Sequence, residues 1–117
     1  MKRHVLGQLE DIEDGTIQAR DVGGRNVVIA RHGDRIFALR DVCPHQGAKL
    51  SNGVMSCSRK NARVGEHHVN MDQPVIRCPW HNWEYDLDHG TCLTHPNHLA
   101  VAAYRAFVED GQIIVET

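Results

Sequence analysis

Residues 78–87 read Cys-Pro-Trp-His-Asn-Trp-Glu-Tyr-Asp-Leu, and residues 43–50 read Cys-Pro-His-Gln-Gly-Ala-Lys-Leu. Each stretch places a cysteine and a histidine close together, with one or two residues between them. The proline after each cysteine fixes a backbone dihedral and removes a hydrogen-bond donor, so each bend is stiff. Two stiff bends that each offer a thiolate and an imidazole suit a metal centre gripped from two sides. The predicted ligands are Cys43, His45, Cys78 and His81.

Two kinds of metal centre compete for this ligand set. Zinc accepts two cysteines and two histidines, but its familiar spacing puts the cysteines on one knuckle and the histidines on a helix. The alternative is a [2Fe–2S] cluster in which both cysteines bind one iron and both histidines bind the other. Each bend would then reach both irons. Each bend here is mixed, which departs from the familiar zinc spacing, but the four ligands alone leave both a structural zinc module and an iron–sulfur centre open.

The two stretches resemble the cluster-binding boxes of Rieske iron–sulfur proteins, and the likeness extends to the flanking glycine, aromatic and Asp-Leu positions. It covers roughly residues 22–117. The resemblance implies an all-β fold of three small antiparallel sheets, with a cluster-binding subdomain at one tip. It also implies one [2Fe–2S] cluster, with His45 and His81 on the exposed iron and Cys43 and Cys78 on the buried one. The residues expected to shield and tune the cluster are Trp80, Trp83 and Tyr85.

The resemblance also points to one branch of the family. High-potential respiratory members carry an extra cysteine in each box, joined as a disulfide, and those positions here are Ala48 and Trp80. Such members place a serine hydroxyl at the position of Trp83, whereas Tyr85 matches the family's other hydrogen-bonding position. Fewer donors stabilise the reduced cluster less well, which lowers the potential. The resemblance therefore implies a low-potential, ferredoxin- or oxygenase-type member without the disulfide.

The chain departs from the family pattern in two places. The boxes are separated by nearly twice the usual spacing, and the excess is the polar segment 58–73, which we expect to be a surface insertion. Asn82 replaces the glycine that usually follows the second histidine ligand; asparagine tolerates positive φ better than most residues. With 117 residues and 13.2 kDa, we expect residues 1–117 to form a single Rieske domain.

Outside the boxes, the sequence predicts short strands separated by glycine turns. Two Gly-containing turns, at 32–34 and at 110–111, are each flanked by apolar runs and predict hairpins. A short turn of helix is expected within 96–102. The predicted strands are 27–31, 35–39, 74–76, 83–87, 104–108 and 112–116.

Composition narrows the class of protein. The net charge of −2 argues against binding to nucleic acid or to an anionic membrane, because both need a basic face. The apolar runs are too short to span a bilayer, and the acidic residues Glu10, Asp11, Glu13 and Asp14 stand where a signal peptide would be apolar. We therefore expect a cytoplasmic protein with no nucleic-acid or membrane partner.

The remaining cysteines, histidines and acidic residues are expected mostly to have structural or solvent-exposed roles. Cys57 and Cys92 match no ligand position, and we expect small buried or half-buried thiols. Two acidic groups could steer a basic redox partner, although such charges more often solvate a surface; they are Glu10, Asp11, Glu13 and Asp14, and Glu84, Asp86 and Asp88. A second metal site is less expected than solvent exposure for His67, His68, His95 and His98.

The resemblance implies a stand-alone Rieske-type ferredoxin that carries one electron from a reductase to a terminal enzyme such as an aromatic-ring oxygenase. A catalytic oxygenase needs a second, mononuclear iron site, and the predicted β fold leaves no separate domain for it, so we do not expect catalysis by this chain alone. A small Rieske subunit of a larger reductase or oxidase complex remains the alternative.

Overall fold

The computed structural model describes residues 2–43, 47–57, 74–79, 83–93 and 100–117. Within these ranges the chain forms nine β-strands and two short 3-10 helices. The helices are η1 (Leu9–Asp11) and η2 (Leu50–Asn52). The strands are β1 (Arg3–Gln8), β2 (Ile17–Val22), β3 (Arg25–His32), β4 (Arg35–Arg40), β5 (Val54–Cys57), β6 (Pro74–Arg77), β7 (Glu84–Asp86), β8 (Ala103–Glu109) and β9 (Gln112–Glu116).

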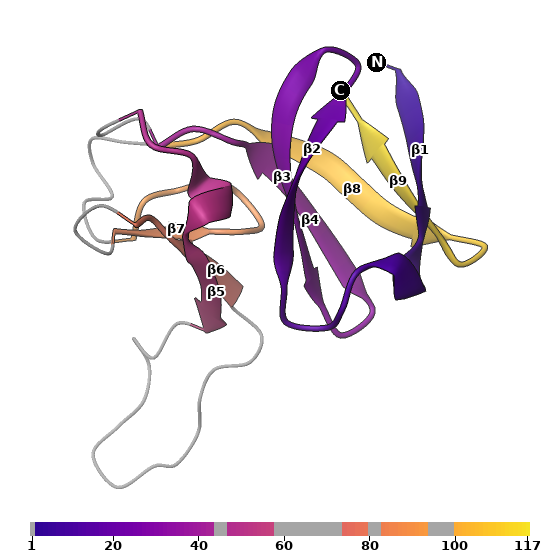
Figure 1. The fold of residues 1–117 in the computed structure, drawn as a ribbon, viewed down its shortest axis with the longest axis horizontal. Coiled ribbons are helices and arrows are strands. Elements are labelled where there is room, and N and C mark those ends of the chain that lie inside the picture. Colours follow the sequence, from indigo (N-terminus) through magenta and orange to yellow (C-terminus); the bar gives the residue numbers. More distant parts are fainter. Residues whose placement is uncertain (1, 44–46, 58–73, 80–82, 94–99) are drawn as a thin grey trace, which may run out of the picture.

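The strands form three antiparallel groups of three, and the expected all-β fold is confirmed. Two of these groups, β1–β9–β8 and β2–β3–β4, join where β8 pairs with β4 through Tyr104 and Ala103, giving a six-stranded order β1-β9-β8-β4-β3-β2. We call these six strands the base. The third sheet, β5–β6–β7, and the loops that join it to β4 and β8 form a smaller subdomain at one end of the base (Figure 1).

Both predicted hairpins are present. β3 and β4 pair from Val27–Arg40 to His32–Arg35, around the turn at Gly33. β8 and β9 pair around Asp110 and Gly111, whose φ angles are 52° and 76°. Two successive positive φ angles are what a type I′ turn requires, and an Asp-Gly pair supplies them at low cost.

The central strands β3 and β4 are buried on both faces, which explains their continuous apolar sequence. Alternate side chains enter two separate clusters because successive residues of a strand point to opposite faces. One face carries Val27, Ile29, Ile36 and Ala38 into the core of the base. The other carries Val28, Ala30, Phe37 and Leu39 into a cluster that continues through the small subdomain. The second cluster therefore fixes the small subdomain against the base, at about 1.5–3 kcal/mol for each fully buried large apolar side chain.

The register of β5 against β6 runs from Val54–Arg77 at one end to Cys57–Pro74 at the other. The cysteine of the second box follows Arg77. Segment 58–73 joins the strands at the opposite end, between Cys57 and Pro74. The predicted insertion itself lies outside the described residues.

Three strands have no counterpart in the sequence prediction: β1, β2 and β5. β1 and β2 are edge strands of the base with several polar residues, and β5 ends at the polar segment, so none shows a sustained apolar pattern. The expected helical turn at 96–102 falls partly outside the described residues; of its described part, Ala100 makes a β-bridge with Thr91. Among the described residues, none of the helices is long and apolar enough to span a membrane.

Candidate metal centre

The two predicted sulfur ligands lie in one buried cluster. Cys43 follows β4 in the base, and Cys78 follows β6 in the small subdomain. Neither side chain is exposed to solvent, and both belong to the cluster that also contains Tyr85 and Leu50. Of the cysteines whose side chains the structure describes, Cys43, Cys78 and Cys92 are all outside disulfides. The fold therefore buries, in one cluster, two thiols that stand thirty-five positions apart in the chain numbering.

The two cysteine bends are closed by equivalent backbone hydrogen bonds. The N–H of Cys43 donates to the carbonyl of Ala48 at 2.7 Å, and the N–H of Cys78 donates to the carbonyl of Trp83 at 2.8 Å. In both bends the acceptor is the fifth residue after the cysteine. The first bend is tightened further because the N–H of Gly47, which has φ 71°, donates to the carbonyl of Cys43 at 2.7 Å. In both boxes the cysteine is therefore tied to the fifth residue after it by the same kind of backbone hydrogen bond.

The two predicted histidine ligands belong to these loops in sequence. His45 stands between Cys43 and Ala48, and His81 stands between Cys78 and Trp83. Both histidines, together with Trp80, lie outside the described residues. Trp83 is half-buried and packs against the cluster that holds the cysteines. The structure thus brings together Cys43, Cys78, Trp83 and Tyr85 of the predicted site.

Tyr85 supplies a polar group inside this cluster. Its hydroxyl lies 3.3 Å from the Sγ of Cys43, and its side chain is fully buried. Burial raises the pKa of Tyr85 well above its usual value, and the hydrogen bond to Cys43 and the nearby Cys92 and Cys78 raise it further. A phenol with a raised pKa keeps its proton, so when Cys43 is a thiolate the Tyr85 hydroxyl is the donor.

The first box is anchored by the buried carboxylate of Asp41. Its Oδ1 accepts a hydrogen bond from the backbone N–H of Ser51 at 2.8 Å, and its Oδ2 accepts one from the Ser51 hydroxyl at 2.7 Å. The N–H of Asp41 donates to the carbonyl of Asn26 in β3. Because Asp41 precedes Cys43 by two residues and Ser51 lies in η2, the carboxylate ties both ends of the box to the base.

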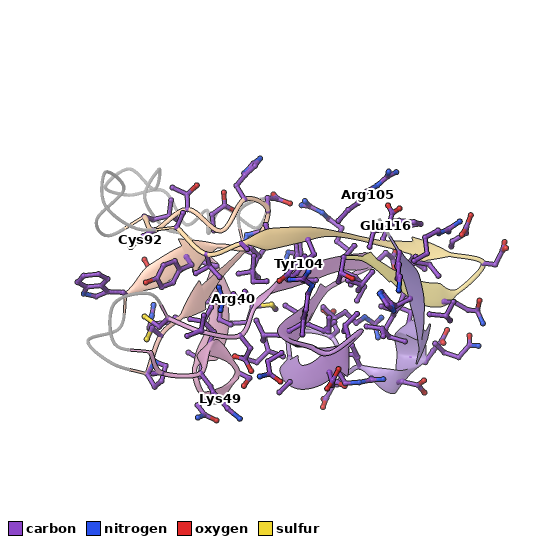
Figure 2. The ribbon with its side chains drawn as sticks, turned by 90° about the horizontal axis from the view of Figure 1, so that it is seen from above. Arg40, Lys49, Cys92, Tyr104, Arg105 and Glu116 are labelled. Carbon is purple, nitrogen blue, oxygen red and sulfur yellow. The ribbon has the colours of Figure 1, made fainter. Side chains whose placement is uncertain are left out.

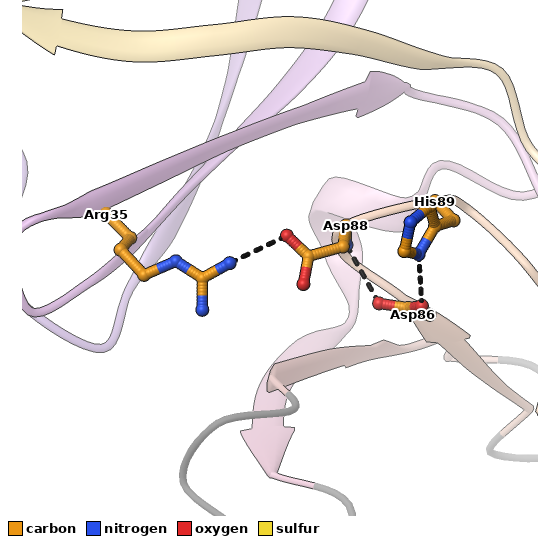
Figure 3. Close-up of polar contacts among 4 residues, drawn as sticks. All are labelled: Arg35, Asp86, Asp88 and His89. Atoms are coloured by element: carbon orange, nitrogen blue, oxygen red, sulfur yellow. Dashed lines mark hydrogen bonds and ion pairs between the residues drawn. The ribbon is translucent and has the colours of Figure 1, made fainter.

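The turn after β7 is held by a second buried carboxylate, Asp86 (Figure 3). Its Oδ1 accepts the backbone N–H of Asp88 at 2.8 Å, and its Oδ2 lies 3.0 Å from Nδ1 of His89. The hydrogen bond and the charge of Asp86 raise the pKa of His89 above its usual value. Asp88 in turn pairs with Arg35 of β4 at 2.8 Å, which links the small subdomain to the base.

These contacts give structural roles to three acidic residues in and directly after the second box. Asp86 and Asp88 hold the turn, and Glu84 pairs with Arg77 across β6 and β7 at 3.1 Å. The structure engages each of them with a neighbouring donor, and a role in steering a basic partner stays a prediction.

The other sequence candidates are placed as follows. Cys92 is fully buried, as expected, and makes a β-bridge with Tyr85. Cys57 ends β5. The four histidines of the weaker metal hypothesis, His67, His68, His95 and His98, lie outside the described residues. Within the described part of the chain, no group of three or more His, Cys, Asp or Glu side chains is arranged to hold a metal ion.

The donor set described here fits an iron–sulfur cluster. Cysteine sulfur is the ligand that such clusters require, and two thiols are buried on equivalent loops with a phenol beside one of them. The half-buried side chain at position 48 is alanine, so a disulfide between the boxes cannot form there. If the ligands are those that the sequence predicts, Cys43 and Cys78 hold one iron and His45 and His81 the other.

Comparison with known proteins agrees with this geometry. The chain is 26% identical over 109 residues to the ferredoxin component of the alkene monooxygenase system of Xanthobacter autotrophicus, which covers 93% of this chain and 76% of that protein. The ferredoxin of carbazole 1,9a-dioxygenase from Nocardioides aromaticivorans superposes with a TM-score of 0.76 at 27% identity, over 98% of this chain and 97% of that one.

A third neighbour has a similar fold. A protein named as the small subunit of an NADH-dependent nitrite reductase from Mycobacterium tuberculosis superposes with a TM-score of 0.78 at 24% identity, over 97% of this chain and 93% of that one. The model of the Rieske [2Fe–2S] domain family matches residues 2–105. The chain therefore belongs to the Rieske [2Fe–2S] domain family, whose cofactor is one [2Fe–2S] cluster.

Proposed function

We propose that this protein is a Rieske-type ferredoxin, a one-electron carrier that receives electrons from a reductase and passes them to a terminal oxygenase. Two relatives that match almost the whole chain are the ferredoxin components of an alkene monooxygenase system and of carbazole 1,9a-dioxygenase. The proposal includes a single domain over residues 1–117 and a cytoplasmic location. The oxygenase substrate is not part of it, because these two relatives serve different oxygenases.

The observation that carries the proposal is the pair of buried thiols on equivalently closed loops. We assign Cys43, His45, Cys78 and His81 as the cluster ligands. A bound cluster accepts and releases one electron reversibly, because one of its irons changes between the ferric and ferrous states. The chain's own residues keep water from the sulfur atoms, close each ligand loop, and place the Tyr85 hydroxyl against Cys43.

The ligand assignment is tested with matched variants of the purified protein. Cys43→Ser and Cys78→Ser should each lose most of the iron and the visible colour, whereas Cys92→Ser, which is equally buried, should keep both. His45→Ala and His81→Ala should behave like the two ligand cysteines, with His89→Ala as the control. The readouts are iron content, the visible spectrum and the EPR spectrum after dithionite reduction. Stoichiometric zinc without iron, or a colourless Cys92→Ser with a coloured Cys43→Ser, contradicts the assignment.

A second candidate function is a fixed small subunit of a larger reductase, and the likeness in fold to the nitrite reductase small subunit favours it. The two candidates differ in how the protein associates with its partner. A free carrier purifies alone at the mass of its own chain and exchanges electrons with a reductase in transient encounters. A fixed subunit co-purifies in constant ratio with a large catalytic chain. Size-exclusion chromatography of the protein from its native cells separates the two outcomes.

A further inference from the structure

A pocket of about 660 Å³ opens beside the first ligand loop. Its walls come from the start of β3, the end of β4 and the loop that carries the first box. The cationic residues around it are Arg25, Arg40 and Lys49, all exposed. Figure 2 shows Arg40, Lys49 and Tyr104, which all line this pocket, where the base meets the small subdomain.

The strand register brings the two arginines to one side of the sheet. Arg40 of β4 is paired with Val27 of β3, so their side chains point to the same face. Arg25 stands two residues before Val27 and therefore points to that face as well. Lys49 reaches the same pocket from the loop before η2. Three separate segments thus contribute positive charge to one hollow.

These three cationic side chains differ from the other described arginines in their contacts with the rest of the protein. Within the described part of the chain, Arg25, Arg40 and Lys49 make no side-chain hydrogen bond or ion pair with the protein. The other described arginines each have a side-chain partner; they are Arg3, Arg20, Arg31, Arg35, Arg77 and Arg105. The arginines without an internal partner are therefore gathered at one pocket.

The carboxylates nearest this pocket are already satisfied. Asp41 lines it, but its carboxylate is buried and accepts two hydrogen bonds from Ser51. Asp21 lies in a neighbouring hollow that Lys49 also lines, and its Oδ1 accepts the N–H of Gly24 at 2.9 Å. Of the charged side chains that line the pocket, three are cationic (Arg25, Arg40 and Lys49) and one is acidic (the buried Asp41), so the pocket offers a net positive charge to a ligand.

The pocket is also next to the proposed electron exit. Gly47 lines it, and Gly47 lies two residues after His45, which we assign as a ligand of the exposed iron. A side chain built at Gly47 would meet no atom within 4 Å, so this bend faces open space. A molecule seated in the pocket would therefore touch the loop that holds one histidine ligand.

We propose that this cationic pocket docks an acidic surface segment, rich in Asp and Glu carboxylates, of the protein's electron-transfer partner. The inference rests on the proposed function, because it assumes that the cluster exchanges electrons with a partner protein. Bidentate pairing with carboxylates suits arginine in particular. Charge complementarity of this kind raises the rate of encounter and fixes the orientation of the partner.

The test uses two cobalt oxidants of opposite charge as probes. The reduced holoprotein is mixed in a stopped-flow instrument with tris(oxalato)cobaltate(III), a trianion, or with hexaamminecobalt(III), a trication. In either reaction the cluster gives up one electron and cobalt(III) becomes cobalt(II). The ionic strength is about 0.1 M, where charges beyond about 10 Å are largely screened. The variants are Arg40→Glu and Lys49→Glu, and Lys2→Glu is the matched control.

Lys2 suits this purpose because it is exposed, pairs with Thr117 through its backbone at the chain termini, and does not line the pocket. Lys49→Glu and Lys2→Glu change the net charge equally. We expect each pocket variant to be oxidised about threefold or more slowly by the trianion and faster by the trication. In Lys2→Glu both oxidation rates should change by less than about twofold. Equal slowing in Lys49→Glu and Lys2→Glu overturns the proposal, because it shows an effect of net charge alone.

A competition experiment identifies the occupant. Hexaglutamate should slow the trianion reaction of the wild type but not that of Arg40→Glu, and hexalysine should not slow it. Inorganic phosphate that competes as well as hexaglutamate at equal concentration overturns the docking proposal in favour of a small-anion site. These failures differ from failure of the proposed function. A protein that takes up no electron from dithionite refutes the carrier role, whereas normal reduction with rates independent of the pocket refutes only the docking site.

Discussion

The hydroxyl of Tyr85 and the sulfur of Cys43 lie 3.3 Å apart, and both side chains are fully shielded from solvent. Tyr85 belongs to β7 in the small subdomain, whereas Cys43 follows β4 of the base. One hydrogen bond therefore joins the two parts of the molecule at a proposed cluster ligand. A donor at a ligand sulfur withdraws negative charge from it and favours the reduced cluster.

Removing that donor should lower the reduction potential. If the hydrogen bond to the Cys43 sulfur is about 0.5–1.5 kcal/mol stronger in the reduced state than in the oxidised state, its loss in Tyr85→Phe corresponds to about 20–60 mV for a one-electron couple. We expect a midpoint potential more negative by that amount, measured by protein-film voltammetry. Tyr104→Phe removes a hydroxyl from a half-buried tyrosine on β8 and should leave the potential unchanged. An unchanged potential in Tyr85→Phe would show that the hydroxyl does not act on the cluster.

The Asp41 anchor should govern retention of the cluster. Asp41→Ala leaves the N–H and hydroxyl of Ser51 without their acceptor, and it should destabilise the protein by about 1–3 kcal/mol. Ser51→Ala removes one hydrogen bond but keeps the backbone contact, so its cost should be about 0.5–1.5 kcal/mol. We expect the visible absorbance at elevated temperature to bleach fastest in Asp41→Ala, then in Ser51→Ala, then in the wild type. Equal bleaching rates for the two variants would mean that the backbone contact is not an anchor.

Gly53 should tolerate no side chain. A Cβ at this position would lie 1.8 Å from the carbonyl oxygen of Arg77, and backbone cannot be displaced there without moving β6. Gly53→Ala should cost at least about 1–3 kcal/mol from overpacking. The comparison is Gly33→Ala, where a Cβ would meet no atom but φ is 62°. Its loss of stability should come from the left-handed backbone conformation alone and should be about 1–2 kcal/mol. Urea unfolding followed by circular dichroism measures both, and a neutral Gly53→Ala would contradict the close approach.

The Asp86–His89 contact should make stability depend on pH. The pKa of His89 is raised in the folded protein by its hydrogen bond to Asp86, so the contact stabilises the fold fully below the ordinary histidine pKa of 6.5. That contribution is lost as the pH rises through the raised pKa. We expect the difference in melting temperature between wild type and His89→Asn to be small, largest near pH 5.5, and to vanish at alkaline pH.

A double-variant comparison isolates this contact. In an Asp86→Asn background, His89→Asn should have a much smaller effect on the melting temperature and its pH profile, because only the weaker influence of Asp88 on the pKa of His89 remains. Asp88, which pairs with Arg35, is present in both backgrounds. If the pH profile of His89→Asn persists without the Asp86 carboxylate, another group is responsible for it.

The hairpins and the box residues could be read from the sequence because their signals are local. Asp110 and Gly111 specify a type I′ turn by their own φ preferences, and apolar runs on either side complete the hairpin. Cys43 and Cys78 carry neighbours that mark them as a pair, and the fold does bury both in one cluster. Such local signals can be recognised without knowing which distant residues they contact in the fold.

The features that escaped the sequence depend on distant partners. β1 is a strand because it pairs with β9 at the other end of the chain, and its own residues do not require it. The engagement of Glu84 and Asp88 by Arg77 and Arg35 depends on cross-strand register and on contact between the two parts of the fold. The cationic pocket likewise arises only when three segments meet. Net charge gave no hint of it, because the chain as a whole is slightly acidic.

The β5–β6 ribbon places segment 58–73 at one end and the proposed ligand Cys78 at the other. The added residues enter and leave at the Cys57–Pro74 end, whereas Cys78 follows the far end at Arg77, a distance of about four residues at roughly 3.3 Å each. A change in the length of segment 58–73 would therefore act at the Cys57–Pro74 end of the ribbon, and the pairing of Val54 with Arg77, next to Cys78, would be unaffected.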